Sequence, residues 1–149
     1  MCLYILKLYE YMMVTTYNLF ISHSWAYGDA YEKLINLLES RPYFLYKDYS
    51  VPKNDPVHTN GTDKELYMAI KNKISQSHVV LIMAGVYSSY SKWIDKEIKI
   101  AKVEFSKPKK IIAIEPWGSE KTSTLVKANA DLIVGWNTES IVSAIRELS

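Results

Sequence analysis

The chain lacks most of what a disulfide framework, a metal site or a membrane span requires. It has 149 residues and a single cysteine, Cys2, so no disulfide and no cluster of cysteine ligands can form within it. Its three histidines, His23, His58 and His78, do not have the spacing of a metal site. No apolar run approaches the roughly 18 residues that cross a bilayer. We therefore expect no metal, no cofactor and no membrane partner.

An excess of charge of either sign is also missing. Eighteen Lys and Arg face sixteen Asp and Glu, the net charge is +2, and no basic run is longer than Lys109-Lys110. Because nucleic-acid-binding domains usually carry a basic patch, we expect no nucleic-acid partner. The composition, 48% hydrophobic and 23% charged, is that of an ordinary globular domain. The lone cysteine suits a reducing compartment, and we predict a cytoplasmic location.

The first twelve residues are apolar but lack the features of a signal peptide. Residues 1–12 have no basic start and no small-residue cleavage site. We interpret them as an extension, either one that is not native because translation starts further downstream, or a short assembly helix. The domain itself is predicted over residues 13–149.

Short apolar runs alternate with helical patterns along that domain. Strands are predicted at residues 17–22, 43–48, 79–84, 110–114 and 131–135. Helices are predicted to begin near residues 30, 62, 91, 122 and 138. Strict alternation indicates βαβ units with right-handed crossovers, and therefore one parallel sheet of five strands. The predicted fold class is α/β, a three-layer α/β/α sandwich of flavodoxin-like type.

Several familiar sites are absent from this pattern. No G-x-G-x-x-G segment follows the first strand, and there is no P-loop. A receiver domain would carry acidic residues after the first and third strands, where this chain has Ser22-His23 and Ala84-Gly85. Ser22 and His23 are not a catalytic pair either, because adjacent strand residues point to opposite faces.

Aromatic residues are abundant instead, with twelve Tyr and four Trp. All four tryptophans follow predicted strands: Trp25, Trp93, Trp117 and Trp136. The carboxyl ends of parallel strands share one edge of the sheet, and the same edge receives Ser22, His23, Ser24, Asp48, Tyr49 and Glu97. A planar ligand with hydroxyl groups would find rings and polar groups there. For Trp117 and Trp136 we favour a packing role.

Trp93 and Glu97 lie one turn apart on the helix after the third strand. At roughly 100° per residue, a stripe faces the sheet, made of Ile94, Ile98, Ala101 and Phe105. Trp93 and Glu97 fall on the border of that stripe. Spacing alone leaves two interpretations open: a functional pair, or an acid favoured by the helix dipole beside a half-buried Trp.

Four segments resemble the TIR-like family that includes the ThsB proteins of bacterial Thoeris anti-phage systems: Phe20-Ile-Ser-His-Ser-Trp25, Lys47-Asp-Tyr-Ser-Val-Pro52, Ala84-Gly-Val-Tyr87 and Trp93-Ile-Asp-Lys-Glu97. The resemblance runs from about Met13 to the C-terminus. Through the Trp-x-x-x-Glu pattern it implies that Glu97 is the catalytic residue of an NAD+-cleaving enzyme. It also implies a substrate pocket lined by Ser22, His23, Ser24, Trp25, Asp48, Tyr49, Tyr87 and Trp93.

The implied activity is that of an NAD+ glycohydrolase or ADP-ribose cyclase, with NAD+ as substrate rather than cofactor. It would make a nucleotide signal in anti-phage defence and reach a downstream effector through its product. The resemblance further implies self-association, with residues 49–61 as an assembly loop. One carboxylate suffices for this chemistry, because nicotinamide leaves as a neutral ring and needs no general acid, unlike the leaving group of ordinary glycosidases.

Two other functions remain open. Some TIR-like domains only bind one another, which would make this chain a non-catalytic interaction module. A nucleoside deoxyribosyltransferase-like enzyme would share the sheet but use Glu97 as a covalent nucleophile. The chain also departs from eukaryotic TIR domains, because His23-Ser-Trp-Ala-Tyr27 replaces their usual acidic and basic residues after the first strand.

Overall fold

A parallel sheet of five strands forms the centre of the protein. The computed structural model describes residues 1–12, 15–22, 29–51, 61–85, 92–115 and 123–149. The strands, paired in the order β2-β1-β3-β4-β5 and all parallel, are β1 (Thr16–Ser22), β2 (Leu45–Asp48), β3 (Val79–Met83), β4 (Lys110–Ile114) and β5 (Leu132–Val134). This order confirms the predicted flavodoxin-like α/β class.

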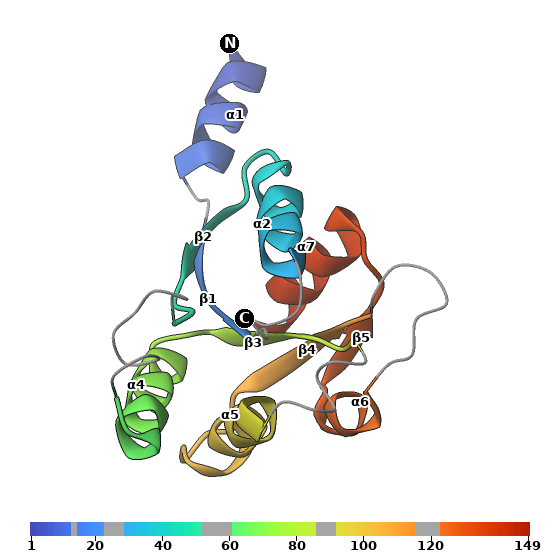
Figure 1. Ribbon diagram of the computed structural model, residues 1–149. Helices are drawn as coiled ribbons and strands as arrows, with labels where there is room; N and C mark the ends of the chain where they lie inside the picture. Colours follow the sequence, from blue (N-terminus) through green and yellow to red (C-terminus); the bar gives the residue numbers. More distant parts are fainter. Residues whose placement is uncertain (13–14, 23–28, 52–60, 86–91, 116–122) are drawn as a thin grey trace.

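Helices cover both faces of the sheet (Figure 1). On one face lie α4 (Asp63–Ser75), α5 (Lys92–Val103) and α6 (Thr124–Asn129). On the other lie α2 (Ala30–Glu39) and α7 (Thr138–Leu148). Neighbouring residues of β1 contribute to opposite cores: Phe20 packs under α4 and α5, whereas Leu19 and Ile21 pack under α2 and α7. The alternation explains why the central strands are apolar along their whole length.

Side-chain caps fix where three of the helices begin. Thr62 Oγ1 accepts a hydrogen bond from the backbone N–H of Glu65 at 3.2 Å, which confirms the predicted start of α4. Asn137 caps α7 through Ser140 N, at 2.8 Å. Ser123 caps α6, one residue after the predicted start. The predicted cap Ser91 lies outside the described residues.

The second strand begins two residues later than predicted. Tyr43 has a φ of 60°, in the left-handed region, so it belongs to the turn after α2 and cannot pair as part of a strand. Phe44 then turns into the core under α2 and α7, and pairing with β1 starts at Leu45. An apolar and aromatic run at 43–48 gives no sign of this backbone change.

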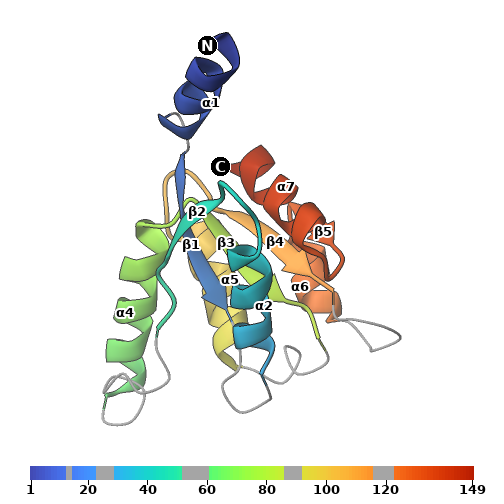
Figure 2. The same cartoon turned by 90° about the horizontal axis from the view of Figure 1, so that it is seen from above.

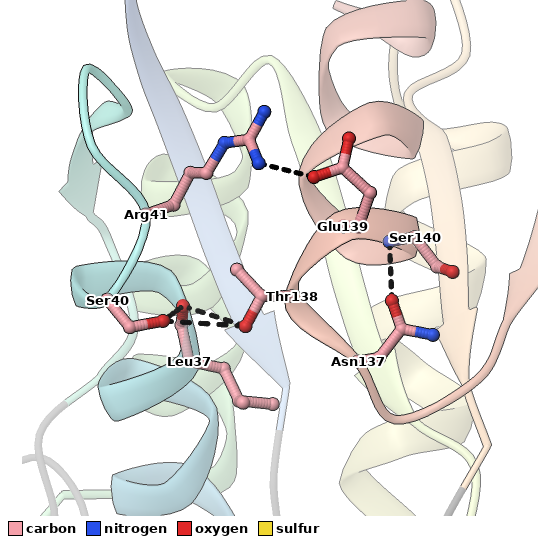
Figure 3. A network of polar contacts seen from close by, with 7 residues as sticks. All are labelled: Leu37, Ser40, Arg41, Asn137, Thr138, Glu139 and Ser140. Atoms are coloured by element: carbon pink, nitrogen blue, oxygen red, sulfur yellow. Dashed lines mark hydrogen bonds and ion pairs between the residues drawn. The ribbon is translucent and has the colours of Figure 1, made fainter.

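Polar contacts join α2 and α7 on the face away from α5 (Figure 3). The carbonyl oxygen of Leu37 accepts hydrogen bonds from Ser40 Oγ at 2.7 Å and from Thr138 Oγ1 at 3.2 Å. Arg41 forms an ion pair with Glu139 one residue further along α7. The end of α2 is thereby fixed to the start of α7.

The N-terminal residues form a helix, α1 (Cys2–Met12), that stands apart from the other helices in both views (Figures 1 and 2). Its apolar side chains are exposed, with 79% of Leu3, 72% of Tyr4 and 62% of Leu6 open to solvent. None of the described helices is long and apolar enough to cross a membrane.

Candidate functional site

Glu97 is an ionisable residue buried beside the apolar core. It lies in the second turn of α5 and is only 7% exposed. Its neighbours on the helix, Ile94 and Ile98, pack into the core beneath α5, as the predicted stripe requires. Among the residues that the structure describes, Glu97 is the one buried side chain that carries an ionisable carboxyl or amino group. Carboxyl groups are rarely placed this way without a purpose, which makes Glu97 the strongest candidate for a functional residue.

Ser22 is the hydrogen-bond partner of Glu97. It is the last residue of β1, is 1% exposed and donates its Oγ–H to Glu97 Oε2. Ser22 shares a strand face with Phe20, and that face looks toward α4 and α5. The carboxyl end of a central strand therefore meets the second turn of α5, which brings together two residues 75 positions apart.

Burial raises the pKa of Glu97 from its ordinary value of 4.5 to about 8, and the hydrogen bond from Ser22 opposes this rise. At neutral pH the carboxyl group of the free protein is therefore mostly protonated. A cation bound next to it would favour the ionised form and lower the pKa again. The site is thus sensitive to the charge of whatever occupies it.

Trp93 lies one turn before Glu97 and carries two lysines over its ring. The indole is half-buried against the core that also contains Ile94. The Nζ atoms of Lys96 and Lys92 lie 4.3 Å and 5.5 Å from the ring centroid, within the range of a cation–π interaction. Positive charge therefore lies on the aromatic surface beside the buried carboxyl group.

Asp48 belongs to a second polar cluster, at the end of β2. Its Oδ1 accepts hydrogen bonds from Ser50 N at 2.8 Å and from Ser50 Oγ at 2.5 Å, and its Oδ2 accepts one from the Tyr31 hydroxyl. Ser50 Oγ in turn accepts a bond from Ile21 N at 3.2 Å, one residue before Ser22. Burial and the carboxylate of Asp48 together raise the pKa of Tyr31. This cluster ties β2 and α2 to the carboxyl end of β1.

The structure places five of the nine predicted site residues. Ser22 and Glu97 contact each other, Trp93 is one turn from Glu97, and Asp48 and Tyr49 lie at the neighbouring end of β2. The other four lie outside the described residues: His23, Ser24, Trp25 and Tyr87. Sequence reasoning did not single out Tyr31, although its place in the first turn of the helix after β1 puts it at the carboxyl edge.

Glu97 is a single buried carboxyl group with a hydroxyl partner. In the part of the chain that the structure describes, no group of three or more His, Cys, Asp or Glu residues could hold a metal ion. Among the described residues, the side chain that hydrogen-bonds to Glu97 is the hydroxyl of Ser22 and not a second acid. Trp136 is half-buried against the core beneath α2 and α7, as its predicted packing role requires.

A comparison with protein families identifies one match. The family model described as "Thoeris protein ThsB, TIR-like domain" matches residues 20–121, more than half of the chain. The matched region contains Ser22, Asp48, Trp93 and Glu97. No curated protein matches the chain.

Proposed function

The chain belongs to the TIR-like domain family of the Thoeris protein ThsB, and from this premise we propose that it cleaves NAD+ to make a nucleotide signal in bacterial anti-phage defence. The observation that carries the proposal is the burial of Glu97, the glutamate of the Trp-x-x-x-Glu pattern, at the carboxyl edge of the sheet. Ser22 hydrogen-bonds to Glu97, and Trp93 lies one turn before it on α5. In the proposal, Asp48 and Tyr49 at the end of β2, together with His23, Ser24, Trp25 and Tyr87, complete the pocket.

The reaction breaks the bond between ribose C1′ and the nicotinamide nitrogen. Both electrons of the bond go to the nitrogen, so the pyridinium ring leaves as neutral nicotinamide and needs no proton. A positive charge develops on the ribose, and the ionised carboxylate of Glu97 stabilises it. A water oxygen then attacks C1′ and loses a proton, giving ADP-ribose. If a nucleophile of the same ADP-ribose attacks instead and loses its proton, the product is cyclic.

The raised pKa of Glu97 suits this substrate. The carboxyl group is mostly neutral in the free protein, which lowers the cost of burying it. The cationic nicotinamide ring, when it binds beside Glu97, favours loss of the proton, so the carboxylate forms where the cation needs it. The proposed product acts on a downstream effector, and the proposed enzyme is cytoplasmic and self-associating.

The test is NAD+ turnover by the purified protein. The protein is incubated at high concentration with NAD+, with and without lysate from phage-infected cells, and nicotinamide and products are followed by mass spectrometry. Glu97→Gln is expected to abolish release. Glu104→Gln, an exposed acid just beyond α5 that pairs with Lys71, is the matched control and is expected to keep it. The product mass separates the cyclase from the hydrolase, since hydrolysis adds one water.

Full turnover by a folded Glu97→Gln protein would overturn the catalytic role. A second candidate function, a non-catalytic interaction module, is favoured by the exposed apolar side chains of α1, such as Leu3 and Leu6. It predicts no loss of NAD+ at any protein concentration, together with measurable self-association.

A further inference from the structure

Ser22 was predicted to line the substrate pocket, but its side chain has almost no surface to offer a ligand. It is 1% exposed, and its hydroxyl is used in the bond to Glu97 Oε2. We infer that Ser22 is a positioning residue that holds one oxygen of the Glu97 carboxylate and leaves the other for the substrate. The expected effect of Ser22 on NAD+ cleavage rests on the proposed function. The expected effect of Ser22 on the pKa of Glu97 rests only on the hydrogen bond between the two residues.

The backbone gives Ser22 a fixed place from which to act. β1 is a central strand, paired with β2 on one side and β3 on the other, and Ser22 is opposite Ile82 of β3. The short Ser side chain has one rotatable bond that places its oxygen, whereas the Glu side chain has three. A hydrogen bond from the rigid partner therefore orders the flexible one. In the described ranges no hydrogen bond reaches Glu97 Oε1, so this oxygen is the one left for a ribose hydroxyl.

Charged groups around α5 do not take over the role of Ser22. Ion pairs and hydrogen bonds engage many of the ionisable groups on α4, β4, α6 and the ends of α5: Asp63 with Lys92, Tyr67 and Lys71 with Glu104, Asp95 with Lys99, Lys102 and Lys110 with Asp131, and Lys127 with Glu115. Lys96 lies over Trp93. Burial raises the pKa of Glu97, and among the described residues the Ser22 hydrogen bond lowers it. Ser22 is thus the group that favours the ionised form.

Ser22→Ala should therefore raise the pKa of Glu97, in addition to any effect on packing. A hydrogen bond to a charged group is worth enough to move a pKa by about one pH unit. The acid limb of kcat/KM for NAD+ is expected to move upward by about that amount, with roughly a tenfold loss at pH 7 and recovery at higher pH. A purely structural role would lower the rate equally at every pH.

The direct experiment follows Glu97 itself in the full chain. The δ-carbon of Glu is labelled with 13C, the Glu97 signal is assigned by its absence in Glu97→Gln, and its titration is recorded by NMR. Ser22→Ala is expected to raise the pKa by about one unit. Ser22→Thr, which keeps the hydroxyl, is expected to restore it. Ser77→Ala is the matched control, because Ser77 is 2% exposed and bonds to the Lys73 carbonyl at the other end of the sheet.

The outcomes separate this inference from the proposed function. An unchanged Glu97 titration in a folded Ser22→Ala protein would overturn the positioning role, even if NAD+ is cleaved. A titration that moves, in a protein that never releases nicotinamide, would support Ser22 and overturn the proposed enzyme. An equal change in Ser77→Ala would also overturn the inference, because it would show an effect of packing and not of the hydroxyl.

Discussion

Glu97 should make the fold less stable as the pH rises, and Glu97→Gln should remove this dependence. The pKa of Glu97 is raised from 4.5 to about 8 in the folded protein. Between these values the folded state binds a proton that the unfolded chain has released. The contribution to the free energy of unfolding is therefore fully present below pH 4.5 and is lost as the pH rises through 8.

The size of the effect follows from the same interval. At about 1.4 kcal/mol for each pH unit, the interval from 4.5 to about 8 corresponds to about 5 kcal/mol. A domain of this size has a free energy of unfolding of roughly 5–15 kcal/mol, so the loss is a large part of the total. A neutral Gln resembles the protonated acid, and the variant should match the wild type near pH 5 and exceed it by several kcal/mol at pH 8.5.

Urea unfolding of both proteins at several pH values between 5 and 9 measures the difference. Glu104→Gln serves as control, because its carboxyl group is exposed and its pKa is lowered by Tyr67 and Lys71. That variant should keep the wild-type slope above pH 6. If the curves of wild type and Glu97→Gln run parallel from pH 5 to pH 9, the carboxyl group is ionised throughout, and the argument from burial fails.

Three further measurements test other parts of the structure. Trp93→Ala should raise KM for NAD+ more than Trp93→Phe in steady-state kinetics, because Phe keeps a ring beside Glu97. Thr62→Ala should lower the free energy of unfolding by about 1 kcal/mol, measured with urea, because α4 loses its cap, while Thr62→Ser keeps it. Removal of residues 1–12 should leave the melting temperature nearly unchanged, because α1 stands apart from the other helices; a large drop would show that α1 belongs to the domain.

The local rules predicted most of the fold. Alternating apolar runs and cap residues such as Thr62 depend on neighbours in sequence, so the five strands and the start of α4 could be recognised. The backbone turn at Tyr43 could not, because a left-handed residue other than Gly leaves no pattern.

The site was predicted less completely, for a different physical reason. The spacing of Trp93 and Glu97 predicted both at the border of the core, because one helix determines it. Trp93 is half-buried as predicted, whereas Glu97 lies deeper and is only 7% exposed. The contact of Glu97 with Ser22 depends on how α5 lies over β1, which no local pattern records. The same holds for the hydrogen bond that Asp48 accepts from Tyr31 of α2, whereas its bonds from Ser50, two residues further on, are local.

A buried acid that is neutral in the free protein should release a proton when a cation binds beside it. With a pKa of about 8, Glu97 is mostly protonated at pH 7, and the charged nicotinamide ring would favour its ionisation. Binding of a non-hydrolysable, positively charged NAD+ analogue is therefore expected to release nearly one proton. NADH, whose ring is neutral, should release almost none and bind more weakly.

Calorimetry in buffers of different ionisation enthalpy measures the number of protons released. Glu97→Gln should bind the charged analogue without release, which assigns the proton to this side chain. Equal proton release with the charged and the neutral ring would contradict the argument, because the proton would then come from a group that does not respond to the nicotinamide charge. The burial of Glu97 would cause both the preference for a cationic ligand and the loss of stability at high pH. Proton release by calorimetry and urea unfolding at several pH values therefore test the same cause.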